Sequence, residues 1–310
     1  MAHPDTTPLA FVGLGQMGRP MALNLCRRAD GAMLTVMSAS GRHHAEFTAL
    51  GARTATAVAE LAGAQVVFLC LPDEAAVREV ALGPTGLEAV LAPGSLVIDT
   101  STIAPAAAIE IEAALARRGI AFVDAPVSGM QARAIEGTLT AMCGATATAY
   151  AAAEPWLRHM ASTVLHMGGI GSGQLAKLVN QLLFDIHCAA LAEVLPMAVK
   201  LGADPDKLAA VVNSGTGRSY ASEFFVPRIL RGHFTDGYPL QDAYKDLVVA
   251  AELGARERIP MPVLAAATAT YQTALAQGHG ALDKGAMIRV HEALLGVQFR
   301  SPSHPGASTS

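Results

Sequence analysis

A glycine-rich loop near the N-terminus constrains the fold of this chain more than any other feature. The segment Gly13-Leu14-Gly15-Gln16-Met17-Gly18 follows the apolar run Leu9–Val12 and opens a stretch with room for a helix. Between a strand and a helix, the first glycine allows a tight turn, the second lets backbone approach a pyrophosphate, and the third lets helix and strand pack closely. Free N–H groups at the helix N-terminus favour phosphate there. We therefore expect these six residues to bind a dinucleotide.

Short strand-like runs alternate with alanine-rich helical stretches through the first half of the chain. The expected strands are Leu9–Val12, Met33–Met37, Val66–Cys70, Leu96–Asp99 and Ile120–Val123, and the expected helices are Met17–Arg28, Arg42–Leu50, Glu74–Val80 and Pro105–Arg118. This order predicts an α/β fold, a doubly wound parallel sheet with helices on both faces.

The second half has a different character. After Gly168 only long helical stretches remain, which are Gln174–Lys200, Pro205–Asn213, Ser222–Leu230, Pro239–Glu257, Pro262–Gln277 and Lys284–Leu295. We expect a dinucleotide-binding domain over residues 1–168 and an all-helical domain over 169–298, joined by the long helix Gln174–Lys200. The Ser-, Pro- and Gly-rich residues 299–310 are expected to be a disordered tail.

Composition excludes several classes of protein. Of the 310 residues 52% are hydrophobic and 15% charged, with a formal net charge of −4, which excludes a disordered chain and leaves no basic stripe for nucleic acid. Asp185, His187 and Glu193 interrupt the most apolar stretch, so no membrane span is expected. The four cysteines lie far apart without metal-ligand spacing. We expect a cytoplasmic protein without a metal site.

The loop after the second strand bears on the choice of cofactor. Chains that prefer NAD carry Asp or Glu there, whereas this chain has Ser38, Ser40 and Arg42 and no acid. Two hydroxyl groups and a guanidinium suit a ribose 2′-phosphate, which favours NADP over NAD. The alternative is that Arg42 only begins a solvated helix.

The ends of the other expected strands carry small, hydroxyl-bearing or proline-containing loops. These are Leu71-Pro72-Asp73, Asp99-Thr100-Ser101-Thr102 and Asp124-Ala-Pro-Val-Ser128-Gly129. Because ligands bind outside the carboxyl ends of parallel strands, we expect a cofactor trough formed by these loops together with the glycine-rich loop.

Lys177 is the expected proton-transfer residue. It lies near the start of the long helix, on one face with Asn180 and Gln181, at the expected domain boundary where ligand sites often form. Its apolar neighbours and an oxidised nicotinamide would both lower its pKa towards the range that suits general acid/base work. The alternative is a surface lysine on an interface helix.

These motifs together resemble the β-hydroxyacid dehydrogenases, a family that includes 3-hydroxyisobutyrate dehydrogenase and tartronate semialdehyde reductase. The resemblance rests on the glycine-rich loop with Met21-Ala-Leu-Asn24-Leu, on Asp124–Gly129 with Gly137-Thr-Leu, on Gly171–Asn180 and on Lys245-Asp246-Leu. It implies a Rossmann-type first domain and NAD(P)-dependent hydride transfer between nicotinamide and a short-chain 3-hydroxyacid or semialdehyde. It also favours a homodimer or homotetramer acting on small molecules.

The resemblance also implies roles for individual residues. Lys177 would be the general acid/base, with Asn180 and Ser128 completing the catalytic group. Substrate would contact Ser128, Gly129, Met130, Gln181, Arg218, Tyr238 and Asp246. Cofactor would contact Gly13, Leu14, Gly15, Gln16, Met17, Gly18, Ser38, Ser40, Arg42, Leu71, Pro72, Thr102 and Lys245.

Three departures from the family pattern affect the substrate pocket. Met130 stands where a second glycine is usual, Gln181 replaces an asparagine, and Arg218 introduces a charge where an aromatic lining is expected. Arg218 is expected to face the crevice between the domains and to pair with a polar substrate end, or else to be solvated. Two other functions remain open. One is an imine reductase, although those enzymes usually lack a lysine at the position of Lys177, and the other is a non-catalytic nucleotide-binding module.

Overall fold

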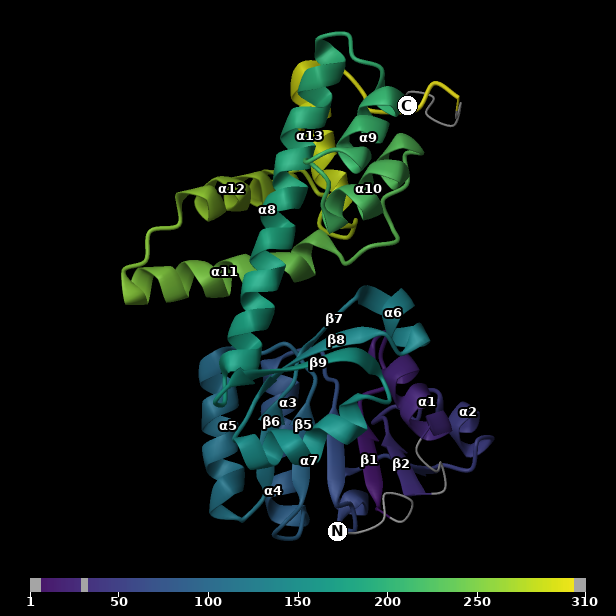
Figure 1. The fold of residues 1–310 in the computed structure, drawn as a ribbon, viewed down its shortest axis with the longest axis vertical. Coiled ribbons are helices and arrows are strands. Elements are labelled where there is room, and N and C mark those ends of the chain that lie inside the picture. Colours follow the sequence, from purple (N-terminus) through teal and green to yellow (C-terminus); the bar gives the residue numbers. More distant parts are fainter. Residues whose placement is uncertain (1–6, 29–32, 304–310) are drawn as a thin grey trace. The chain divides into compact units, whose positions relative to one another are not determined.

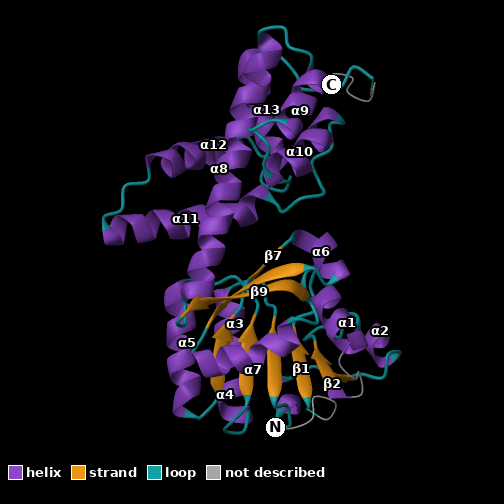
Figure 2. Ribbon diagram, viewed as in Figure 1, coloured by secondary structure: helices purple, strands orange, loops and turns teal. Residues whose placement is uncertain are grey.

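The computed structural model describes residues 7–28 and 33–303, which form two compact units. The first runs to Lys177 and the second begins at Leu178, so helix α8 (Ser172–Lys200) crosses the boundary between them. Figure 1 shows the order of the elements, and Figure 2 separates helices from strands.

A nine-stranded sheet forms the centre of the first unit. Its parallel part has the strand order β3-β2-β1-β4-β5-β6. The strands of this part are β1 (Leu9–Val12), β2 (Leu34–Met37), β3 (Arg53–Ala55), β4 (Val66–Leu69), β5 (Leu96–Asp99) and β6 (Ala121–Asp124). This is the order of a dinucleotide-binding sheet, in which the strand order reverses between β1 and β4. The expected doubly wound fold is confirmed.

The far edge of the sheet is not parallel, which the sequence did not predict. Strand β8 (Leu139–Gly144) pairs antiparallel with β6 and with the two-residue β7 (Val127–Ser128), and β9 (Ala161–Gly168) pairs parallel with β8. The three-residue β3 was also missed. Strands this short carry too few residues for their periodicity to be recognised.

Both faces of the sheet are buried, because alternate strand residues enter different cores. Leu9 and Phe11 of β1 belong to one cluster, while Ala10 and Val12 belong to the other. This explains why the strands are continuously apolar. The helical segments of this unit are α1 (Gly18–Arg28), α2 (His44–Thr48), η3 (Val58–Leu61), α3 (Glu74–Leu82), α4 (Leu87–Val90), α5 (Pro105–Arg117), α6 (Met130–Glu136) and α7 (Ala147–Leu157).

In the described part of the second unit, the chain outside its loops is helical. After α8 come α9 (Pro205–Ser214), α10 (Tyr220–Leu230), α11 (Leu240–Glu257), α12 (Pro262–Ala276), η4 (Lys284–Met287) and α13 (Ile288–Leu295). Helix starts follow simple chemistry: the Asp204 carboxylate accepts a hydrogen bond from the N–H of Lys207, and Pro205 occupies the first turn. The expected stretch Lys284–Leu295 is divided into a 3₁₀ turn and α13.

Helix α8 is long and apolar enough, by length and composition alone, to cross a membrane. Its middle instead carries the buried Asp185, which pairs with the equally buried Lys284 and accepts a hydrogen bond from Tyr271 at 2.8 Å. Cys188 and Leu195 of α8 lie in the same core. Part of the apolar surface of α8 therefore lies in the core of the helical unit.

Residues 299–303, which the sequence analysis placed in a disordered tail, are ordered. Phe299 is fully buried, and its N–H donates to the Glu292 carboxylate at 2.8 Å. The N–H of Ser301 donates to the carbonyl oxygen of Leu230 at 3.0 Å. One aromatic ring and these hydrogen bonds are enough to attach residues 299–303 to the helical unit. Residues 304–310 lie outside the described part of the chain.

Candidate active site

The glycine-rich loop connects the end of β1 to the start of α1. A Cβ atom on Gly13 (φ +98°) would clash with the carbonyl oxygen of Cys70, and one on Gly18 would clash with that of Gly13. Packing within the protein therefore requires both glycines. A Cβ on Gly15 would meet no atom within 4 Å. The space beside Gly15 at the α1 N-terminus fits a dinucleotide pyrophosphate.

The three polar residues after β2 lie in one tight turn. The Ser38 and Ser40 hydroxyl oxygens are 3.3 Å apart, and the N–H of Arg42 donates to the Ser40 hydroxyl at 3.4 Å. Gly41 in this turn has φ +68°. The turn places two hydroxyl groups and one exposed guanidinium together, as a phosphate group would need.

The loops after β4 and β5 are bonded to each other. The N–H of Leu71 donates to the Ser101 hydroxyl at 2.9 Å, and the Thr100 hydroxyl donates to the carbonyl oxygen of Leu69 at 2.6 Å. Leu71, Pro72 and Thr102, all expected to contact cofactor, therefore belong to one connected group of loops.

Asp124, the last residue of β6, anchors the start of α8. Its carboxylate accepts hydrogen bonds from the N–H groups of Gly171 at 2.8 Å and Gln174 at 2.9 Å. Burial raises the pKa of Asp124 from 3.8 to about 7, although these two N–H groups oppose the rise. Burial also raises the pKa of Asp99, its register partner on β5, to about 6. The first turn of α8 is thus attached to the carboxyl edge of the sheet.

Lys177 lies in the next turn of α8. Its side chain is 8% exposed, and Nζ donates to the carbonyl oxygen of Val127 at 2.9 Å. Val127 immediately precedes Ser128 and Gly129, which has φ +137°. The structure therefore brings the lysine amine beside the segment expected to bind substrate.

Met130, the next residue of this segment, has φ +58°, in the left-handed region that favours glycine. A methionine in that conformation is strained. The departure from the family pattern noted in the sequence therefore has a backbone consequence.

Gln174 is a buried polar residue that the sequence analysis did not single out. Its side-chain oxygen accepts the N–H of Ile103 at 3.1 Å, and its Nε2 donates to the carbonyl oxygen of Ser101 at 2.9 Å. A polar residue three positions before Lys177, on the same face of a mainly apolar helix, was the available signal.

In the helical unit, α8 and α11 bring two expected site residues together. Gln181 Nε2 donates to the Asp246 carboxylate at 3.2 Å, and Asp246 is buried. Burial raises the pKa of Tyr238, and the hydrogen-bonded Lys245 opposes this rise. Asn180 lies one turn beyond Lys177 on α8. Gln181, Asp246, Tyr238 and Lys245 thus form two contacting pairs.

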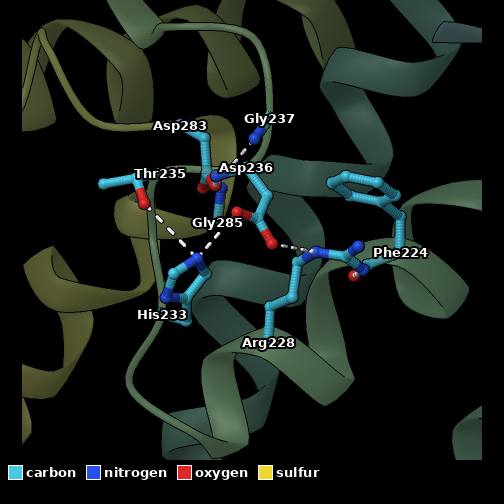
Figure 3. Close-up of polar contacts among 8 residues, drawn as sticks. All are labelled: Phe224, Arg228, His233, Thr235, Asp236, Gly237, Asp283 and Gly285. Carbon is cyan, nitrogen blue, oxygen red and sulfur yellow. Dashed lines mark hydrogen bonds and ion pairs between the residues drawn. The ribbon is translucent and has the colours of Figure 1, made fainter. Parts of the chain in front are cut away.

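The loop that leads to Tyr238 is held by ionic and hydrogen-bonded contacts (Figure 3). Asp236 contacts His233 Nε2 at 2.7 Å and Arg228 Nε at 3.1 Å. The buried Asp283 accepts the N–H of Asp236 at 3.1 Å. These contacts fix the loop within the helical unit.

Arg218 forms an exposed ion pair. Its Nε lies 2.8 Å from the carboxylate of Glu223, and the two side chains are 62% and 46% exposed. This local contact leaves the expected role of Arg218 towards substrate as a prediction.

Comparison with known proteins identifies the family. Residues 8–169 match the NAD-binding domain of 6-phosphogluconate dehydrogenase, and residues 171–291 match the NAD-binding family of NADP-dependent 3-hydroxyisobutyrate dehydrogenase. The chain is 34% identical over 291 residues to 2-(hydroxymethyl)glutarate dehydrogenase of Eubacterium barkeri, which covers 93% of this chain and 96% of that protein.

Solved structures give the same picture. The 3-hydroxyisobutyrate dehydrogenase of Salmonella typhimurium has a TM-score of 0.81 and 30% identity, over 91% of this chain and 99% of that one. Psf3 in complex with NADP⁺ and 2-OPP has a TM-score of 0.80 and 29% identity, with coverages of 91% and 99%. An imine reductase from Pseudomonas sp., at 18% identity and a TM-score of 0.60 over 92% and 99%, shares the fold alone.

Proposed function

This chain belongs to the β-hydroxyacid dehydrogenase family, and we propose that Lys177 is the general acid and base of its reaction. The protein is an NAD(P)-dependent oxidoreductase that acts on short-chain 3-hydroxyacids. The nicotinamide, when bound, exchanges hydride with the hydroxyl-bearing carbon. The protein must therefore bind, orient and move one proton.

The contact between Lys177 and Val127 carries the proposal. With Nζ held 2.9 Å from the Val127 carbonyl oxygen, the amine is almost enclosed and directed at the Ser128 segment. In oxidation the neutral amine takes the proton of the substrate hydroxyl. In reduction the ammonium returns a proton to the carbonyl oxygen.

We propose the other roles from the positions that these residues occupy in the family's motifs. Ser128 and the Gly129 N–H hold the substrate carboxylate, Met130 shapes the pocket, and Asn180 orients the substrate. Gln181, Arg218, Tyr238 and Asp246 are assigned to the substrate, and Lys245 to the cofactor. The Gln181–Asp246 hydrogen bond and the electrostatic interaction of Lys245 with Tyr238 support treating these four residues as two units.

The glycine-rich loop and the loops after β2, β4 and β5 hold the cofactor. The open space at Gly15 accommodates the pyrophosphate, and Leu71, Pro72 and Thr102 line the nicotinamide side. The turn Ser38–Arg42 favours NADPH, because it offers hydroxyl donors and a cation where an acid would repel a 2′-phosphate.

We also propose that the protein is a homo-oligomer located in the cytoplasm. The helical unit exposes large apolar side chains, among them Leu201 (80%), Val211 (65%) and Val263 (63%). Such residues are commonly buried when subunits assemble. Light scattering across a range of concentrations tests this, and a monomer at every concentration contradicts it.

The substitution Lys177→Ala tests the proton-transfer role. It should lower kcat by roughly 10²–10⁴-fold, since the amine acts mainly in the transition state. The Kd for NADPH should stay near that of the wild type, and added methylamine should restore part of the turnover. Lys200→Ala, at the exposed end of the same helix, is the matched control and should leave kcat unchanged. Near-normal kcat in Lys177→Ala would assign the proton to another group.

A further inference from the structure

Gln174 makes contacts that neither catalysis nor cofactor binding has yet required. The side chain is 1% exposed and extends from the first turn of α8. Its amide group accepts one hydrogen bond and donates another, both to the backbone of the loop after β5, at Ile103 and Ser101. These partners lie more than 70 residues earlier in the chain, so the pairing exists only in the folded state.

The loop that Gln174 contacts also has hydrogen bonds of its own. The N–H of Ser101 donates to the Asp99 carboxylate at 2.9 Å, and the Ser101 hydroxyl accepts the N–H of Leu71. Through Ser101, one glutamine is thus connected to both loops expected to line the nicotinamide side of the cofactor.

Lys177 follows Gln174 by three residues, so the two side chains lie on neighbouring positions of one helical face. The first turn of α8 has two attachments to the sheet edge. Asp124 attaches its backbone to β6, and Gln174 attaches it to the loop after β5. A shift of this turn towards or away from that loop would be opposed by the Gln174 hydrogen bonds and would carry Lys177 with it.

The chemistry of the position suits an amide. A backbone carbonyl and a backbone N–H must both be satisfied, and an amide supplies one donor and one acceptor together. Ionised Glu has no donor, and Met has neither, although both have a similar length. Buried backbone groups left without partners are costly.

We propose that Gln174 is a positioning residue that fixes Lys177 relative to the cofactor-side loop Thr100–Ile103. The proposal rests on the proposed role of Lys177. Gln174 does not touch the reacting atoms, and it acts by limiting how far the amine can move from the loop. Misplacement of a catalytic group by about 1 Å can cost 10²-fold in rate.

The test is a double-mutant cycle of Gln174→Met with Lys177→Ala, measured as the single-turnover rate of NADPH oxidation. In the wild-type background, Gln174→Met should lower the rate roughly 10- to 100-fold with little change in the substrate KM. In the Lys177→Ala background the same substitution should change the rate less than about threefold, because the group it positions is absent.

Two further variants keep the test decisive. Gln174→Glu retains an acceptor for the Ile103 N–H and, with its buried carboxyl group protonated, a donor for the Ser101 carbonyl oxygen. It should therefore show a smaller rate loss, and it replaces Gln174→Met if that protein does not fold. Ser95→Ala removes a buried hydrogen bond to the Ala64 carbonyl oxygen at the other end of β5, and should leave the rate unchanged.

The outcomes separate the two proposals. A normal rate in Lys177→Ala would overturn the proposed function and this inference with it. A second outcome is that Lys177→Ala is slow while Gln174→Met causes the same fold-loss in rate in the Lys177→Ala background as in the wild type. In that case Lys177 keeps its role and Gln174 is structural. Equal rate losses in Ser95→Ala and Gln174→Met would also overturn the inference.

Discussion

Gly173 packs so closely against Asp124 that a Cβ atom on Gly173 would lie 2.7 Å from the Asp124 carboxylate oxygen Oδ2. A Cβ on Gly144 would clash with the other carboxylate oxygen. The glycines therefore let the backbone of β8 and α8 enclose the carboxylate of Asp124. This enclosure excludes water, which is why the pKa of Asp124 rises even though two N–H groups donate to it.

Stability should fall as pH rises, because of Asp124. Its pKa is about 7 in the folded protein and ordinarily 3.8, so the folded state binds the proton more tightly. The free energy of unfolding should decrease between pH 4 and 7 and level off above pH 7, by up to about 4 kcal/mol for this group. Urea denaturation of wild type and Asp124→Asn at several pH values checks this. The variant's own cost does not depend on the ionisation of residue 124, so parallel curves for the two proteins would contradict the prediction.

Gly15→Ala and Gly18→Ala should fail in different ways. Gly18→Ala places a Cβ against the carbonyl oxygen of Gly13, so it should destabilise the fold by roughly 2–4 kcal/mol. Gly15→Ala meets no protein atom and should keep its Tm, while its Kd for NADPH rises at least about tenfold because the methyl group occupies the pyrophosphate position. Thermal denaturation and fluorescence titration measure the two effects. Unchanged NADPH affinity in Gly15→Ala would place the cofactor elsewhere.

Arg42→Ala should reduce the preference for NADPH. Loss of one charge-assisted contact to a 2′-phosphate should lower the ratio of kcat/KM for NADPH over NADH by roughly tenfold. Arg53, exposed at the start of β3, offers a control for net charge alone. An unchanged ratio in Arg42→Ala, or an equal change in Arg53→Ala, would remove this turn from 2′-phosphate recognition.

Met130→Gly should stabilise the protein. Removing the strain of a left-handed methionine should raise the free energy of unfolding by about 1–2 kcal/mol. The greater freedom of glycine in the unfolded chain should lower it by about 0.5–1 kcal/mol. Gln131→Gly, at the next and exposed helical position, should destabilise by about 1 kcal/mol. The free energy of unfolding in urea distinguishes the two. A destabilised Met130→Gly would mean that packing of the methionine side chain outweighs its backbone strain.

Arg218→Leu should weaken the binding of acidic or hydroxylated substrates more than that of methyl-branched ones. The measurement is kcat/KM across a panel of 3-hydroxyacids. Stability should hardly change, because the Arg218–Glu223 pair is exposed. Glu223→Gln breaks the same pair but keeps the arginine, so it should preserve the preference. If both variants lose activity equally on all substrates, Arg218 has a structural role only.

The cofactor loop and family could be predicted because their information is local. The spacing of Gly13, Gly15 and Gly18 between a strand and a helix specifies a turn, a helix start and a close contact, and the comparisons confirm the family and the enzyme class. Strands β1 and β5 were predicted with their observed ends, since buried parallel strands are short and continuously apolar.

Tertiary structure decided what joins these local pieces. The antiparallel pairing of β8 with β6 and β7, the enclosure of Asp124, and the bonds of Gln174 to Ser101 and Ile103 each connect residues that are distant in sequence. Hydrogen bonds between residues so far apart produce no periodic pattern or fixed motif spacing in the sequence. The sequence by itself determined the candidates for binding a dinucleotide and moving a proton. Only the folded sheet edge, by closing around one carboxylate and one amide, determined where Lys177 is held.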